Sequence, residues 1–171
     1  MEGGFQGGWH NATEECLLAE RTGYQPKPPR DLYWEDVQEG EELPTLAMPI
    51  TVTRCAFMAS ASRDFAPQHH NREYAQQRSK ARDMFLGTHF NIGMLCRFMT
   101  DWGGPGSIIR RTKLGMRRPI CARDDMIMTG YVTGKYVRDG EHRVDIDIAV
   151  STQDGPAYVC GGTLALPARN S

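Results

Sequence analysis

The spacing of apolar residues predicts one long helix in the middle of the chain. After Gly87, large apolar side chains recur at three- and four-residue intervals, and Gly103-Gly104-Pro105 follows the last of them. This spacing places them along one face of an α-helix, and the glycines and proline favour its termination. The recurring residues are Phe90, Met94, Leu95, Phe98, Met99 and Trp102. We therefore expect a core helix with one broad apolar face.

Beyond Pro105 the pattern changes to a period of two. Residues 144–150 alternate strictly between apolar and small or acidic side chains, which is typical of a half-buried strand. Arg138-Asp139-Gly140-Glu141 and Gln153-Asp154-Gly155-Pro156 have the composition of turns. The strands predicted around these turns are 126–137, 142–152 and 157–166. The second half of the chain is thus expected to form an antiparallel meander.

Shorter elements are predicted before the core helix. Residues 41–52 read as an extended edge strand, since Pro44 and Pro49 interrupt them. A helix is expected over 53–62, capped by Thr53, and a second at about 71–79, capped by Asn71. The apolar positions that suit the first helix are Ala56, Phe57, Ala59 and Ala61, and in the second helix Tyr74 and Ala75 are expected to face inward.

These elements indicate the α+β class, with an antiparallel sheet wrapped around the apolar helix. A chain of 171 residues can bury one core but is too short for two ordinary domains and a linker. Residues 1–30 begin with a glycine-rich stretch and end in the proline-rich spacer 24–30. We therefore expect an N-terminal extension at 1–30 and a single domain over 31–171.

Composition argues against several functional classes. Twenty basic and twenty-one acidic side chains give a formal charge of −1, so no global field attracts nucleic acid or an anionic membrane. No apolar run approaches the ~18 residues of a membrane span, and the first residues lack the order of a signal peptide. Five cysteines, widely spaced and without a CxxC pair, indicate reduced thiols rather than disulfides or zinc ligands. A cytoplasmic protein that binds neither nucleic acid nor membrane is expected.

The segment Asp64-Phe65-Ala66-Pro67-Gln68-His69 is the first candidate site. A carboxylate and an imidazole on either side of a proline turn can converge on one water molecule. The carboxylate accepts a proton, and the imidazole orients the water and exchanges a proton with the substrate. The alternative is structural, with Asp64 ending a helix and His69 lying on the surface.

Gly87, at the start of the predicted core helix, is the second candidate. A residue without a side chain lets a ligand oxygen approach backbone N–H groups at the positive end of a helix, which suits an oxyanion such as a thioester enolate. The alternative is a glycine that serves only the turn into the helix.

A basic cluster is the third candidate. Guanidinium groups match phosphate oxygens, so such a cluster on a strand and the turn after it can bind the phosphates of a nucleotide-bearing ligand. The residues are Arg110, Arg111, Lys113, Arg117 and Arg118. The alternative is an ordinary solvated face.

Taken in order, these residues resemble the MaoC-like (R)-specific enoyl-CoA hydratases, which have the hot-dog fold. The resemblance covers about 31–167. The family motif Asp-x-Asn-Pro-x-His reads here as Asp64 to His69, with Ala66 at the asparagine position, and it is followed by Ala75 and Gly87. It implies that Asp64 and His69 form the catalytic pair, that the Gly87 amide binds the thioester carbonyl, and that the fold is a hot-dog α+β fold.

Further stretches resemble the single-hot-dog subunits of actinobacterial steroid side-chain hydratases. They are Arg63-Asp64-Phe65, His69-His70 and Thr100-Asp101-Trp102-Gly103-Gly104-Pro105. The resemblance implies a hydratase that converts a 2-enoyl-CoA to a 3-hydroxyacyl-CoA, with a bulky or steroid-derived acyl group and with no cofactor or metal. It also implies a homodimer, or a heterodimer with a second MaoC-like chain. Two alternatives remain, a noncatalytic hot-dog subunit and an acyl-CoA thioesterase.

Overall fold

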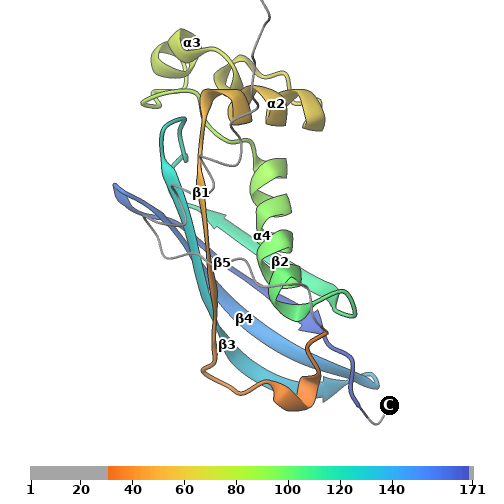
Figure 1. The fold of residues 1–171 in the computed structure, drawn as a ribbon. Coiled ribbons are helices and arrows are strands. Elements are labelled where there is room, and N and C mark those ends of the chain that lie inside the picture. Colours follow the sequence, from red (N-terminus) through yellow and green to blue (C-terminus); the bar gives the residue numbers. More distant parts are fainter. Residues whose placement is uncertain (1–30, 170–171) are drawn as a thin grey trace, which may run out of the picture.

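The computed structural model describes residues 31–169, which form one antiparallel sheet with helices against one face and at one end (Figure 1). The strands are β1 (Glu42–Pro49), β2 (Ile108–Met116), β3 (Asp125–Arg138), β4 (Glu141–Thr152) and β5 (Gly155–Ala165). They lie in the order β1-β3-β4-β5-β2. The helices are α2 (Val52–Ser62), α3 (Arg72–Gln77) and α4 (Thr88–Gly103), with 3₁₀ turns η1 (Trp34–Asp36) and η2 (Pro67–His69). The extension expected at 1–30 lies outside the described residues.

Helix α4 packs lengthwise against the sheet, as Figure 1 shows, and the core lies between them. Its apolar face buries Met94, Leu95, Phe98 and Met99, which confirms the predicted core helix. Phe90 and Trp102 are only half-buried, since they lie at the margins of that face. A side chain at Gly162 of β5 would collide with Met99, so the absence of a Cβ there lets the helix approach the sheet.

The meander predicted for the second half is confirmed. β3 and β4 join through Asp139 and Gly140, both with positive φ (54° and 76°), as a two-residue hairpin turn requires. Along β4 the buried positions alternate with more exposed ones, and the buried side chains are Val144, Ile146, Ile148 and Val150. β1 pairs only with β3 and is an edge strand, as its two prolines predict.

Helices α2 and α3 lie together near the N-terminal end of α4 (Figure 1), and here the structure corrects two details, the cap of α2 and the orientation of Tyr74. The cap of α2 is Thr51 and not Thr53, because the Thr51 hydroxyl accepts a hydrogen bond from the Arg54 N–H at 3.0 Å. Of the four apolar positions named for this helix only Ala59 is buried, and Phe57 is 71% exposed. Tyr74 is exposed as well, since α3 spans only six residues and buries Ala75 alone.

The four cysteines of the described segment, Cys55, Cys96, Cys121 and Cys160, are free thiols. Burial raises the pKa of the Cys55 thiol to about 12, so it stays protonated in neutral solution. Between residues 31 and 169, no helix is both long and apolar enough to cross a membrane.

Candidate active site

Asp64 follows α2 in a turn whose backbone is sharply bent. Arg63 ends the helix in the left-handed region, at φ 54° and ψ 24°, and this reverses the chain so that Asp64 faces the start of α4. The Asp64 side chain is 29% exposed, and its Oδ1 accepts a hydrogen bond of 3.4 Å from the Ala66 N–H. The carboxylate therefore keeps a second oxygen, Oδ2, for other contacts.

His69 ends the 3₁₀ turn η2 and is nearly buried, with 5% of its side chain exposed. Its Nδ1 lies 2.7 Å from the carbonyl oxygen of Phe85. Because a carbonyl oxygen only accepts hydrogen bonds, Nδ1 carries a proton and donates it. The other nitrogen, Nε2, lies 3.4 Å from Asp64 Oδ2. The exchangeable position of the imidazole therefore faces the carboxylate.

Gly87 adjoins both groups. A Cβ on Gly87 would lie 3.4 Å from Asp64 Oδ2 and 3.5 Å from His69 Nε2, so the missing side chain leaves open space beside the pair. Gly87 is also the N-cap of α4 and has an ordinary extended backbone, with φ −77° and ψ 158°. The structure thus brings three residues selected from the sequence to one place, at the positive end of a 16-residue helix.

A cavity of about 480 Å³ opens at this place. Asp64, His69 and Gly87 lie in its wall together with Met116 and Tyr158. The remaining lining residues are Gln68, Ser79, Ala81, Phe85, Leu86, Thr88, Arg117, Arg118 and Pro119. The wall therefore combines the loops around η2, the start of α4 and the segment after β2.

The structure divides the predicted basic cluster. Arg117 and Arg118 line the cavity, whereas Arg110 and Arg111 do not. Arg110 lies six residues before Met116 on β2, roughly 20 Å along the strand. Its guanidinium forms an ion pair with Glu141, and that of Arg111 lies 3.6 Å from Asp145. Of the predicted basic cluster, only Arg117 and Arg118 thus place positive charge at the cavity.

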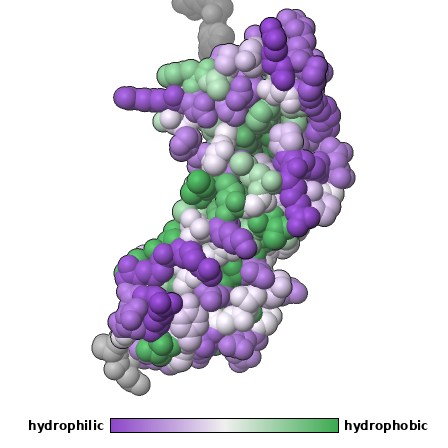
Figure 2. Space-filling model, turned by 180° about the vertical axis from the view of Figure 1, so that it is seen from behind, coloured by the Kyte–Doolittle hydropathy of each residue, from purple (hydrophilic) through white to green (hydrophobic). Residues whose placement is uncertain are grey.

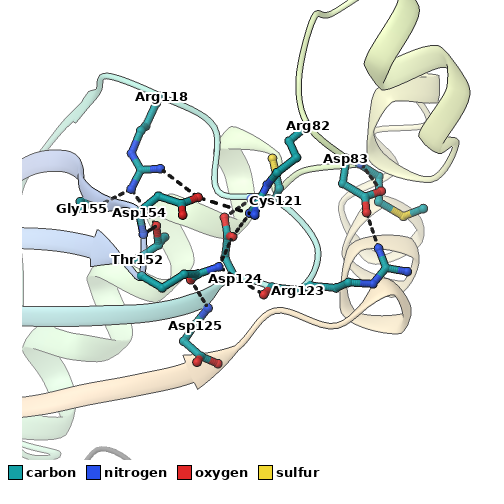
Figure 3. A network of polar contacts seen from close by, with 12 residues as sticks. Arg82, Asp83, Arg118, Cys121, Arg123, Asp124, Asp125, Thr152, Asp154 and Gly155 are labelled. Atoms are coloured by element: carbon teal, nitrogen blue, oxygen red, sulfur yellow. Dashed lines mark hydrogen bonds and ion pairs between the residues drawn. The ribbon is translucent and has the colours of Figure 1, made fainter.

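The two arginines at the cavity differ in their contacts. Arg118 donates to Thr152 Oγ1 at 2.7 Å and to the Gly155 carbonyl (Figure 3), and also to the Pro156 carbonyl at 2.9 Å, so its guanidinium is held. No ion pair or hydrogen bond joins the Arg117 side chain to any residue between 31 and 169. Arg117 is therefore the arginine whose charge remains available at the cavity.

A polar network behind the cavity holds the wall segment after β2, and sequence reasoning did not find it. Asp124, 1% exposed, accepts hydrogen bonds from the Cys121 N–H at 2.7 Å and from Gln153 Nε2 at 2.9 Å, and it pairs with Arg82 (Figure 3). Asp154 lies within 3.6 Å of Arg82. No local sequence signal marks these partners, since Arg82 and Asp124 are 42 residues apart.

Two further polar residues, one in the cavity wall and one in contact with it, were also missed. Tyr158 lines the cavity, and Asn91 donates to its hydroxyl oxygen at 3.1 Å. Asn91 offered one signal in the sequence. It is a polar residue at the fourth position after Gly87, on the helix face where apolar residues are expected.

Comparison with known proteins agrees with this architecture. No family model matches the chain. Over 101 residues the chain is 34% identical to the 3-oxo-4,17-pregnadiene-20-carboxyl-CoA hydratase beta subunit of Mycobacterium tuberculosis. The matched segment covers 59% of this chain and 76% of the relative. A crystal structure of the ChsH1-ChsH2 complex from the same organism contains a similar chain, with 28% identity and a TM-score of 0.69. That match covers 76% of this chain and 98% of the other.

A more distant structure shares the fold. It is the MaoC-like dehydratase from Rhodospirillum rubrum, with 16% identity and a TM-score of 0.70, and the match covers 81% of this chain and 98% of that one. The antiparallel sheet around a single long helix is thus the hot-dog fold. With the sequence relationship to the hydratase beta subunit, this places the chain in the MaoC-like enoyl-CoA hydratase family.

Proposed function

We propose that this protein catalyses the reversible addition of water to the double bond of a 2-enoyl-CoA, which gives a 3-hydroxyacyl-CoA. The observation that carries the proposal is the meeting of Asp64 Oδ2 and His69 Nε2, 3.4 Å apart, beside the open space at Gly87. A base, an acid and a helix N-terminus are the groups that addition of water to a conjugated thioester requires.

The three residues have separate roles in the reaction. Asp64 takes one proton from water while the water oxygen bonds to C3 of the enoyl group. The electron pair of the double bond moves toward the thioester, and the Gly87 N–H stabilises the resulting enolate oxygen. His69 then gives its Nε2 proton to C2. Transfer of the proton from Asp64 to His69 across their 3.4 Å contact restores both groups.

The hydrogen bond between His69 Nδ1 and the Phe85 carbonyl supports this assignment. It fixes the ring so that only Nε2 can exchange a proton with a ligand. Burial of the imidazole limits its access to bulk water, which favours transfer to a bound substrate. The reaction uses groups of the chain and the thioester itself, without a metal or cofactor.

Arg117 is the residue we assign to the CoA phosphates. Its guanidinium lies at the cavity and is free of partners within residues 31–169, whereas Arg118 is held by Thr152 and Pro156. Arg118 then serves to hold the wall from which Arg117 projects. Arg110 and Arg111 do not line this cavity, and they form ion pairs with Glu141 and Asp145. We assign them to CoA binding only if a dimer places the cavity of a second subunit near them.

The name of the M. tuberculosis relative supports an acyl group derived from a steroid, and the name of the ChsH1-ChsH2 complex supports a second, different chain as partner. We therefore include in the proposal a ring-bearing acyl-CoA substrate and a dimer, formed with a second copy or with a related MaoC-like chain. The proposal also includes a single domain over 31–171 and a cytoplasmic location.

The test is to incubate the purified chain, alone and together with a second MaoC-like chain, with short, long and ring-bearing 2-enoyl-CoA thioesters. Loss of the conjugated thioester absorbance and gain of one water with CoA still attached support the proposal. Asp64→Asn and His69→Ala should each abolish turnover while circular dichroism shows an unchanged fold. Release of free CoA would instead identify a thioesterase. Absence of turnover under every condition would identify a noncatalytic subunit.

A further inference from the structure

The outer face of the sheet, which is the face turned away from α4, carries no helix of residues 31–169 (Figure 1). Two large apolar side chains project from it, Tyr131 of β3 and Val159 of β5, which are 49% and 50% exposed. Both line a hollow of about 470 Å³, together with Thr129 and Ala149. Exposed apolar surface around a hollow is typical of a contact with another molecule.

The strand register places charged residues in one row across this face. Gly161 of β5 pairs with Asp147 of β4 on one side and with Lys113 of β2 on the other. Tyr131 continues the row on β3, and Glu42 continues it on β1. Paired residues of antiparallel strands point to the same face. An acidic and a basic side chain therefore flank β5, one strand to each side, with no side chain between them.

The neighbouring row contains a similar pair that is satisfied within one chain. The Arg111 guanidinium lies 3.6 Å from Asp145, and Thr163 between them donates to Asp145 and accepts from Arg111. By contrast, neither the Asp147 nor the Lys113 side chain forms an ion pair or a hydrogen bond with any residue between 31 and 169, and both are exposed. Their charges are therefore available to another chain.

The arrangement is complementary to itself. If two copies pack outer face to outer face about a two-fold axis parallel to β5, β4 of one copy lies over β2 of the other. Asp147 of each copy then faces Lys113 of the other. Gly161 faces Gly161 and Val159 faces Val159 on the axis. An axis across the strands would instead place β4 over β4, and thus acidic residues over acidic residues.

We propose that the outer face of the sheet binds a second copy of this chain in this way. Asp147 pairs with Lys113 on both sides of the axis, and the stem of Lys113 enters the hollow of the other copy beside Tyr131. Val159 is buried in the contact, and the missing side chain at Gly161 lets the two sheets approach. The contact leaves the edges β1 and β2 free, and it does not depend on the proposed hydratase function.

The experiment exchanges the two charges in the full chain and measures the dimer dissociation constant by sedimentation equilibrium. Asp147→Lys and Lys113→Asp each place like charges opposite one another, so each should raise the dissociation constant about 10-fold or more. The double variant has opposite charges again at both positions. Its dissociation constant should return to near the wild-type value, which a change of net charge or of local structure would not produce.

Matched variants locate the contact. Asp101→Lys makes the same charge change on α4, on the other side of the sheet, and should leave the dissociation constant unchanged. Val159→Asp brings two carboxylates together on the axis and should raise it. Val137→Asp changes a valine that is 56% exposed at the hairpin end of β3, six residues beyond Tyr131, and should not. Circular dichroism checks the fold of every variant.

Unchanged dissociation constants for both single charge variants would overturn the assignment. So would a weakening in both that the double variant does not reverse, because Asp147 and Lys113 would then not face each other. A wild-type chain that stays monomeric at its highest soluble concentration would overturn it as well. If Asp147→Lys does not fold, unchanged dimerisation of Lys113→Asp and Val159→Asp would do so. None of these measurements uses turnover, so the hydratase function is tested separately.

Discussion

The missing side chain at position 87 matters because two ionisable groups lie next to the space it leaves. A Cβ there would lie 3.2 Å from the Met58 sulfur, 3.4 Å from Asp64 Oδ2 and 3.5 Å from His69 Nε2. The last two distances are those of ordinary van der Waals contacts. The backbone of Gly87 itself is extended and accommodates any residue. The glycine is therefore required for access to the pair rather than for backbone conformation.

Replacement of Gly87 by alanine is expected to impair catalysis without unfolding the protein. The added methyl group would displace a ligand from the Asp64–His69 pair, and kcat/KM for hydration should fall on the order of 100-fold. Gly93→Ala is the matched control, because a Cβ at Gly93 in the same helix meets nothing within 4 Å. It should keep full activity and gain up to about 1 kcal/mol in the free energy of unfolding. Equal activities of the two variants would contradict this role for Gly87.

The turn that directs Asp64 toward the start of α4 holds the backbone of Arg63 in a strained conformation. It is a non-glycine residue at φ 54°, a conformation that costs a side-chain-bearing residue about 1 kcal/mol or more. Arg63→Gly should therefore raise the free energy of unfolding, by up to about 1 kcal/mol. Part of this gain is offset because glycine has more conformational entropy to lose from the unfolded chain. Ala56→Gly, at an exposed position inside α2, should lower it by about 1 kcal/mol. Urea unfolding measures both, and a loss of stability in Arg63→Gly would show that the turn is not strained.

At the scale of elements, the cavity wall depends on segments that are short and irregular. α3 has six residues, η2 has three, and the segment between β2 and β3 contains no helix or paired strand beyond the isolated bridge from Cys121 to Phe85. Such segments lack the repeated hydrogen bonds of a helix or sheet. Side-chain contacts to Asp124 and Asp83 supply the missing constraints, as Figure 3 shows for the loops that meet there.

Asp124→Ala is expected to lower the free energy of unfolding by about 2–4 kcal/mol. The substitution leaves the buried Cys121 N–H without its acceptor, and it also removes the partner of Arg82 and of the exposed Gln153 amide. Asp101→Ala serves as control, because Asp101 forms an exposed ion pair with Arg97 that contributes about 0.5 kcal/mol or less. The measurement is urea unfolding of both variants. A loss for Asp124→Ala as small as that of the control would show that the network does not hold the wall.

At the scale of the whole molecule, the sheet has two open edges, β1 and β2. Large apolar side chains are exposed on β2 and on β3 and β5, among them Ile108, Met116, Tyr131 and Val159. Figure 2 shows hydrophobic surface gathered in the hollowed middle of the molecule, between two more polar ends. Open strand edges and exposed apolar surface favour association with another chain.

Association is therefore expected in solution. The chain alone, or mixed with a second MaoC-like chain, should sediment as a dimer, and a homodimer would have about twice the 19.2 kDa of one chain. Analytical ultracentrifugation at micromolar concentration makes the measurement. A monomer in both samples would contradict the expectation and would leave the proposed active site within one subunit.

Much of the fold follows from periodicity that is visible in the sequence. The spacing from Phe90 to Trp102 predicts α4, and the alternation over 144–150 predicts β4. Where the prediction was wrong, as for Tyr74, the pattern was short and the helix lies at one end of the molecule. Such a helix buries only the face toward its few neighbours, and a window of ten residues does not reveal which face that is.

The candidate site was predictable in part and for a different reason. Asp64 and His69 are five residues apart around a proline, so their proximity is a local property that the sequence indicates. The contact of Asn91 with Tyr158 spans 67 residues, and the pairing of Arg82 with Asp124 spans 42. Contacts of this kind depend on strand register and on helix orientation, which a single sequence does not specify.

The sequence by itself therefore determined the long helix, the meander, the Asp64–His69 turn and the small residue at the helix start, because each arises from interactions among near neighbours in the chain. Only the tertiary structure decided that Gly87 faces that turn, that Arg117 and not Arg110 lies at the cavity, and that Asn91 is buried with a free acceptor. These outcomes are set when the sheet closes on α4, since close packing fixes the distances between segments that the chain keeps far apart.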